Sequence, residues 1–199
     1  MSKRRVSTVS GPAAVLRRDD VDTDALFPAP YLRLTQRAGM GRYLFADWRA
    51  EGRPEVGFMQ AAAPPRFLVA GANFGCGSSR EHAVWGLLQG GIRAVVGTSF
   101  AGIFADNAAN NGLLLIELAP GPVAELAARA ADPARNRMTI DLPAQTIATA
   151  DGAVLGFDIP ARRKDHLVRG LDAIGATLDH AEAIRAFQAR HLAAQPWLA

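Results

Sequence analysis

The sequence predicts an α/β fold with parallel strand pairs, and three observations lead to that prediction. Short apolar runs with the length and composition of buried strands recur along the centre of the chain. Stretches with one apolar face, expected to be helices, separate these runs, and glycines follow each stretch. Strands that alternate with helices in this way are typical of a parallel sheet. The expected strands are residues 67–70, 92–96 and 113–118, and the expected helices are residues 79–89 and 100–110.

Shorter elements are expected on both sides of this central block. Residues 13–16 are predicted to form a first strand, and the glycines and prolines of residues 51–65 indicate an irregular connector. We expect one domain over residues 1–199, with residues 120–199 as a structural tail. Within this tail the pattern predicts helices at 123–130 and 162–169, strands at 138–142, 146–149 and 154–159, and a loop at 170–175. A capping box at Asp179-His180-Ala181-Glu182 is expected to begin a last helix that reaches about His191.

A glycine-rich stretch, residues 71–80, links the expected strand 67–70 to the following helix. Glycine permits backbone conformations that other residues avoid, and a helix N-terminus offers free N–H groups that suit an anion. Ser78 and Ser79 add hydroxyl groups, and Arg80 can bind a carboxylate through two parallel hydrogen bonds. The stretch therefore predicts either a pocket for a small carboxylate or a plain strand–helix connection with serine as N-cap.

Two known phosphate motifs are absent from this stretch. Gly77 is followed by Ser78-Ser79 and no lysine, which excludes a P-loop, and Arg80 stands where the dinucleotide fingerprint needs its third glycine. A nucleotide site is therefore disfavoured.

Two further segments leave alternatives open. Residues 19–24 contain four aspartates, which are expected either to form a solvated turn or to place a carboxylate beside a basic group. Residues 28–43 begin with prolines and carry three arginines and two glycines, which is typical of a substrate lid or of an ordinary surface loop. We expect residues 28–41 to become ordered only with a partner and substrate.

Composition excludes several classes of protein. No apolar run reaches the ~20 residues that a membrane span needs, and no hydrophobic signal core follows the basic start, so a cytoplasmic protein is expected. The net charge is +3 and the basic residues are dispersed, which disfavours nucleic acid as a partner. The one cysteine, Cys76, can form no internal disulfide and cannot hold an iron–sulfur cluster alone. The four histidines have no metal-binding spacing.

Residues 73–83, Asn-Phe-Gly-Cys-Gly-Ser-Ser-Arg-Glu-His-Ala, resemble the signature of the small subunit of 3-isopropylmalate dehydratase. That subunit is the free-standing form of the swivelling domain of aconitase. The resemblance extends along nearly the whole chain, through residues 21–24, 45–49, 91–96, 99–101, 110–114 and 170–178.

The resemblance implies a swivelling β/β/α domain of the aconitase small-subunit type, paired with a large subunit that holds a [4Fe–4S] cluster. It implies that Ser78 is the base that removes a proton from the carbon beside a substrate carboxylate. Arg80 would bind a carboxylate of the small dicarboxylate substrate, and Ser79 would donate hydrogen bonds nearby. Asp24 would support the proton transfer, and Arg33 would be a candidate contact to the substrate side chain.

The expected function is therefore the small subunit of a hydro-lyase that interconverts 2-isopropylmalate and 3-isopropylmalate in leucine biosynthesis. The chain departs from the family at Leu26-Phe27, at Val84, at Gly86 and within residues 97–104. These departures leave open a hydratase for another substituted malate, such as citramalate or a dimethylmaleate hydrate. A partnerless binding module is the alternative from another class, and the intact Ser78-Ser79-Arg80 argues against it.

Overall fold

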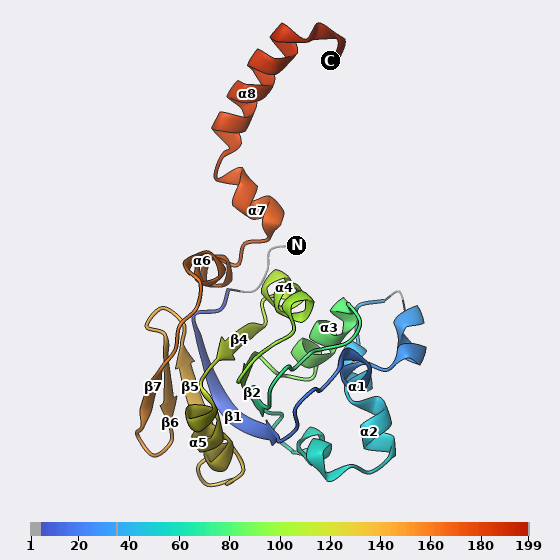
Figure 1. Ribbon diagram of the computed structural model, residues 1–199, viewed down its shortest axis with the longest axis vertical. Helices are drawn as coiled ribbons and strands as arrows, with labels where there is room; N and C mark the ends of the chain where they lie inside the picture. The colour runs from blue at the N-terminus through green and yellow to red at the C-terminus, as the bar shows by residue number, and fades with distance from the viewer. Residues whose placement is uncertain (1–4, 35, 199) are drawn as a thin grey trace.

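The computed structural model describes residues 5–34 and 36–198 and builds them on a seven-stranded sheet (Figure 1). The strands lie in the order β4-β3-β2-β1-β5-β6-β7. They are β1 (Thr8–Leu16), β2 (Phe67–Ala70), β3 (Ala94–Gly97), β4 (Leu114–Glu117), β5 (Arg137–Asp141), β6 (Thr146–Thr149) and β7 (Val154–Gly156). The β1–β4 pairs are parallel and the β5–β7 pairs antiparallel, so the predicted α/β fold with parallel pairs is confirmed.

Strand β1 joins the two halves of the sheet. Its residues 13–16 pair in parallel with β2, and its residues 8–12 pair antiparallel with β5. The sequence predicted only the first of these segments, because Gly11 and Pro12 are residues that usually end a strand. Here they lie where β1 changes partner, and the Pro12 carbonyl accepts a hydrogen bond from the Arg66 amide at 2.7 Å.

Helices cover both faces of the sheet, and each face has its own apolar core. The helices are α1 (Thr23–Leu26), α2 (Ala46–Ala50), α3 (Glu81–Gln89), α4 (Gly102–Asn111), α5 (Pro120–Ala130), α6 (Ala161–Arg169), α7 (Ala173–Leu178) and α8 (Ala181–Ala194), with 3-10 helices η1 (Ala29–Arg33), η2 (Met40–Tyr43), η3 (Pro54–Gln60) and η4 (Pro196–Leu198). Leu68 packs with α3 and α4, whereas Phe67 and Val69 pack with α5. Side chains of β2 alternate between these cores as the strand period requires.

Three local predictions need correction. The connector 51–65 contains η3, and the expected loop 170–175 contains the start of α7, because the Asp172 carboxylate caps that helix through the Gly175 amide at 2.6 Å. The capping box is wrong: α8 has His180 as N-cap with no side-chain hydrogen bond, because Asp179 instead pairs with Arg169.

The glycine-rich loop, residues 71–80, is held on both sides by backbone hydrogen bonds. These bonds join it to residues 20–23 on one side and to residues 99–101 on the other. They run from the Asp20 amide to the Ala72 carbonyl (3.0 Å), Gly75 to Val21 (2.7 Å), Thr23 to Cys76 (2.9 Å), Phe74 to Ser99 (3.2 Å) and Ala101 to Phe74 (3.1 Å). The loop therefore has a fixed course although it lies outside the sheet.

Gly75 is a position in this loop where a side chain does not fit. Its φ is +81°, and a Cβ built there would lie 2.2 Å from Cγ of Phe104 on α4. Both the backbone conformation and the close approach of α4 therefore require the absence of a side chain.

We expect Gly75→Ala to lower the free energy of unfolding by about 2–4 kcal/mol, because backbone strain and a steric clash add. The measurement is urea denaturation followed by circular dichroism. Gly102→Ala is the matched control, since its Cβ would meet nothing within 4 Å, and it should change stability by less than about 1 kcal/mol. Equal stability of the Gly75 variant and the control would contradict this account of the loop.

Candidate active site

Asp24 and Arg80 meet beside the glycine-rich loop. Asp24 lies in the first turn of α1, which Asp22 caps by accepting a 2.7 Å hydrogen bond from the Ala25 amide. Nη1 of Arg80 donates a hydrogen bond to Oδ1 of Asp24. The Arg80 side chain is 14% exposed and that of Asp24 is 52% exposed. The fold therefore holds the guanidinium in place and leaves the carboxylate at the open end of the pair.

The aspartate-rich segment, residues 19–24, both forms a turn and places a carboxylate beside a basic group, the two alternatives that the sequence left open. Three of its carboxylates make structural hydrogen bonds, and the fourth faces a cation. Asp19 accepts from the Ala72 amide at 2.7 Å, Asp20 from the Asn73 side chain at 2.8 Å, Asp22 from the Ala25 amide at 2.7 Å, and Asp24 from Arg80. The first two of these bonds hold the segment against the glycine-rich loop, and the third forms the turn that presents Asp24.

Ser78 and Ser79 precede the helix and do not belong to it. Helix α3 begins at Glu81 with Arg80 as N-cap and without a side-chain cap, so the expected helix start at residue 79 and the interpretation of serine as N-cap are wrong. Both serines are exposed. The buried hydroxyl of Thr23 donates a 2.7 Å hydrogen bond to the Ser78 carbonyl, which fixes the backbone beneath them. Their hydroxyls form no hydrogen bond within residues 5–34 and 36–198.

Arg33 is not brought into the Asp24–Arg80 pair. It ends η1, is exposed, and forms no hydrogen bond or ion pair within the part of the chain that the structure describes. An aromatic cluster packs against η1. Tyr31 stacks on Tyr43 with 4.3 Å between ring centroids, and both contact the buried Phe27 edge-on. Phe27 also lies 5.5 Å from the ring of His82 on α3.

Residues that the sequence analysis missed hold the loop 28–43 on α3. The Gln89 side chain donates to the Arg37 carbonyl at 2.5 Å and accepts from the Met40 amide at 2.7 Å. The Arg37 guanidinium lies 4.0 Å above the ring of Trp85, and it is 3.8 Å from the Glu81 carboxylate. The arginines in the loop were noticed in the sequence, but nothing in their pattern identifies these partners.

Asn111 holds the two α3 residues that bind Arg37. Its amide nitrogen donates to Glu81 at 2.6 Å and its amide oxygen accepts from the Trp85 indole at 2.9 Å. The same nitrogen donates to the Asn107 carbonyl at 2.9 Å. Asn111 thereby fixes the surface of α3 on which the loop lies.

Cys76 and His82 flank the two serines and have shifted pKa values. Burial raises the pKa of the Cys76 thiol, and the charges of Asp22 and Asp20 raise it further. Burial lowers the pKa of His82, and nearby Arg37 and Arg80 add to that effect while Glu81 opposes it. A neutral thiol and a neutral imidazole are therefore expected at pH 7, which argues against Cys76 as a nucleophile.

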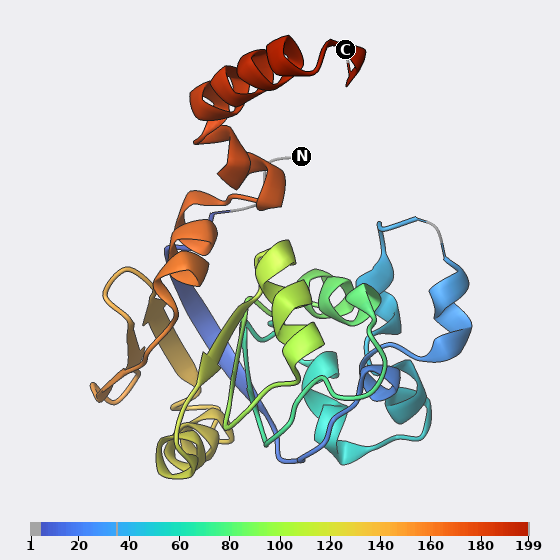
Figure 2. The ribbon, with the colours of Figure 1, turned by 45° about the horizontal axis from the view of Figure 1, so that its top comes forward.

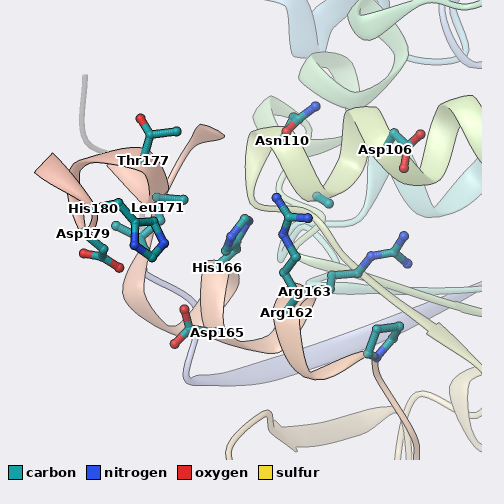
Figure 3. Close-up of a pocket in the computed structure, with 13 residues that line it drawn as sticks. Asp106, Asn110, Arg162, Arg163, Asp165, His166, Leu171, Thr177, Asp179 and His180 are labelled. Carbon is teal, nitrogen blue, oxygen red and sulfur yellow. The ribbon is translucent and has the colours of Figure 1, made fainter. Parts of the chain in front are cut away.

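Two cavities of the described residues are lined by residues other than the two serines. A cavity of about 410 Å³ lies beside Asp24 and is also lined by Asp20, Asp22 and Trp48. A cavity of about 880 Å³ lies elsewhere, between α4, α6 and α7, and Figure 3 shows Arg162, Arg163 and His166 pointing toward α4 within it. Ser78 and Ser79 are exposed, whereas the Arg80 side chain is mostly covered.

Neither a metal centre nor a membrane-spanning helix is found in the described residues. No group of three or more His, Cys, Asp or Glu side chains there could hold a metal ion. No helix among the residues that the structure places is long and apolar enough to cross a membrane.

Comparison with known proteins identifies the family. The chain is 41% identical over 199 residues to 3-isopropylmalate dehydratase small subunit 1 of Mannheimia succiniciproducens, with 98% of each chain covered. It is 44% identical over 198 residues to the 3-isopropylmalate dehydratase small subunit of Methylobacterium radiotolerans, covering 97% of this chain and 98% of that one. The chain belongs to this family. The family that the signature predicted is therefore confirmed.

Family models and a solved structure agree with this assignment. Residues 3–121 match the aconitase C-terminal domain, residues 124–161 match LeuD_N, and residues 174–199 match the C-terminal domain of the 3-isopropylmalate dehydratase small subunit. The crystal structure of 3-isopropylmalate dehydratase from Methanocaldococcus jannaschii superposes with a TM-score of 0.66 at 30% identity, over 91% of this chain and 99% of that chain. The predicted swivelling fold of the aconitase type is confirmed.

We expect Cys76 to react slowly with iodoacetamide, with a rate that still rises at pH 9, above the usual cysteine pKa of about 8.5, because burial and two carboxylates disfavour the thiolate. Mass spectrometry gives the rate without ambiguity, since the chain has one cysteine. Asp22→Asn keeps an oxygen to cap α1 but removes a charge, so it should accelerate the reaction. A rate that levels off below pH 8.5 in the unmodified chain would overturn the assignment.

Gln89→Ala should release the loop from α3. The Met40 amide loses its acceptor and the Arg37 carbonyl loses its donor, so amides of residues 37–41 should exchange with deuterium at least about 10-fold faster. Hydrogen-exchange mass spectrometry measures this, with Gln188→Ala on the exposed face of α8 as the matched control. Exchange that is the same in both variants would show that Gln89 does not hold the loop.

Proposed function

We propose that this chain is the small subunit of a hydro-lyase that interconverts 2-isopropylmalate and 3-isopropylmalate through 2-isopropylmaleate, in leucine biosynthesis in the cytoplasm. The observation that carries the proposal is the near full-length match to small subunits of that name. The Asp24–Arg80 pair beside two exposed serines supports it, since this reaction needs a carboxylate-binding cation next to a base.

The reaction removes water from one malate isomer and adds it back in the opposite orientation. A proton leaves the carbon beside a carboxylate, hydroxide departs from the neighbouring carbon, and a double bond forms between them. In our proposal Ser78 accepts that proton and later returns it to the other carbon. Serine is a weak base, so its alkoxide needs a nearby positive charge and little water.

Arg80 is suited to bind the substrate carboxylate. Its guanidinium has five N–H donors, and the bond to Asp24 comes from Nη1 alone. The remaining donors can form the paired hydrogen bonds that orient a carboxylate. In our proposal Asp24 holds Arg80 in position and supports the proton transfer, while Ser79 donates to the substrate beside Ser78.

The partner would supply what this surface lacks. With one cysteine, the chain does not have the ligands for a [4Fe–4S] cluster, which we place on a large subunit. Covering the exposed serines with that subunit would exclude water and strengthen the attraction between Arg80 and negative charge. The substrate would then be bound between the two chains.

A hydratase for another substituted malate, of the citramalate or dimethylmaleate type, is the second candidate. One observation favours keeping it: Phe27, where the family usually has isoleucine, is fully buried beneath Tyr31 and Tyr43. This departure lies directly under the loop that we propose to contact the substrate side chain, including Arg33. The loop could therefore accept a different alkyl group.

Ser78→Ala should reduce turnover at least ~100-fold, because the proton would lose its acceptor. The assay is anaerobic, uses the cluster-loaded large subunit, and follows the conjugated alkene acid by ultraviolet absorbance with 2-isopropylmalate and citramalate in parallel. Ser10→Ala on the exposed face of β1 is the matched control and should retain full activity. Full activity of the Ser78 variant would exclude that residue as the base, and the preferred acid would decide between the two candidates.

A further inference from the structure

The C-terminal arm, which we define as α7, α8 and η4, extends away from the body of the protein. Figure 1 shows it as the red segment above the sheet, and the turned view of Figure 2 shows the same separation. Helix α8 is 14 residues long and none of its described residues is buried. A helix of this length is only marginally stable alone in water and gains most of its stability from packing against other elements. Within residues 5–34 and 36–198, α8 therefore has no face buried against the body of the protein.

Apolar side chains are concentrated on this arm. The described residues include nine large hydrophobic side chains that are exposed, and seven of them lie in the arm. The other two are Ile103 and Val154. The seven are Ile174, Leu178, Ile184, Phe187, Leu192, Trp197 and Leu198. Phe187 is 57% exposed and Trp197 is 75% exposed, and aromatic residues of this kind are enriched at the centre of protein interfaces.

The base of the arm is fixed to α6 by specific bonds. Nη1 and Nη2 of Arg169 donate to the two carboxylate oxygens of Asp179 at 2.7 and 2.8 Å. The Leu171 amide donates to the His166 carbonyl at 2.9 Å, and Asp172 caps α7. These bonds give the arm a defined direction, so less conformational entropy is lost when it binds.

We propose that the arm binds an apolar groove on the large subunit, an inference that rests on the proposed function. Residues 3–121 match the aconitase C-terminal domain, whereas residues 174–199 match a separate model for the C-terminal part of the dehydratase small subunit. A domain that a linker joins to the rest of an enzyme stays at a high effective concentration beside it, whereas a separate subunit lacks this advantage. A separate subunit therefore needs additional interface, and the arm provides it.

The polar residues on α8 argue against a second copy of this chain. A 14-residue helix is about 21 Å long, and a stable interface buries about 800 Å² on each partner. The face of α8 that carries Ile184 and Phe187 is interrupted by Gln188 and His191. Two such faces of α8 would meet with these polar side chains between them, which does not suit the apolar centre of a stable dimer. The large subunit, in contrast, would cover the arm in addition to the open surface around Ser78.

Charge argues against the arm folding back onto its own body. A cavity at the base of the arm lies between α4, α6 and α7, and it is lined by charged and polar groups that include Arg162, Arg163 and Asp106 (Figure 3). An apolar helix face would bury these groups without compensation, which is costly. The apolar residues of the arm thus need a surface outside this chain.

The test compares three variants for binding to the large subunit by biolayer interferometry and for turnover. One is truncated after His180, which keeps α7 and the Arg169–Asp179 pair. The second is Phe187→Ala with Trp197→Ala. The control is Ala186→Gln, which changes an exposed residue on the opposite side of α8.

We expect the first two variants to bind the large subunit at least about 30-fold more weakly, as loss of a central interface residue does, and the control to bind normally. Turnover at saturating concentration should stay within about twofold of wild type, since Ser78 and Arg80 are unchanged. Unchanged affinity would overturn the proposal. So would a dimer of the wild-type chain in light scattering that the variants lose while they still bind the large subunit normally.

The two proposals can fail separately. If wild type binds the large subunit through the arm but neither acid is converted, the proposed substrate is wrong and the inference about the arm stands. If both acids are tested and one is converted while the truncated variant binds as wild type does, the function stands and the inference about the arm is wrong.

Discussion

The backbone of residues 71–80 is the constraint on which the rest of the site depends. It is bonded to residues 20–23 on one side and to residues 99–101 on the other, and each bond joins segments that are far apart in the sequence. Arg80 and Asp24 are 56 positions apart, and they meet because the Thr23 amide and hydroxyl bind the loop at Cys76 and Ser78. A change that moved this backbone would separate the cation from the carboxylate without altering either residue.

The sequence predicted what depends on local pattern. The strand at 67–70 and the alternation of strands and helices follow from apolar runs and glycine stops, and the structure has them within a few residues. The pairing of Arg80 with Asp24 and the attachment of Arg37 to Trp85 could not be predicted, because both depend on where distant segments meet. The capping box failed for the same reason: Arg169, ten residues away, takes the carboxylate of Asp179 that local pattern assigned to α8.

Within this small region, the groups that hold the backbone in place are different from the groups that are exposed to solvent. The groups that position others are buried or bonded: Thr23 is buried, the Arg80 side chain is mostly covered, and Gly75 fits closely against Phe104. The groups that would contact a substrate, Ser78 and Ser79, are exposed and rest on a carbonyl that Thr23 holds. A preorganised frame reduces the cost of orienting a bound molecule, while an open surface lets a second chain complete the site.

Two features lack a partner within the described residues, the Ser78 hydroxyl and helix α8, and they have a common physical explanation. A serine in contact with water is a poor base, and an apolar helix in contact with water is poorly stabilised, so both need a surface that removes water. One large subunit that covered Ser78 and also held the arm would meet both needs. Because α8 lies well away from α1 and α3 in both views of the fold, the affinity between the subunits and the chemistry of the site could then be set by different residues (Figures 1 and 2). Proton removal would begin only after assembly, since only the assembled site is dry enough to stabilise the charge on Ser78.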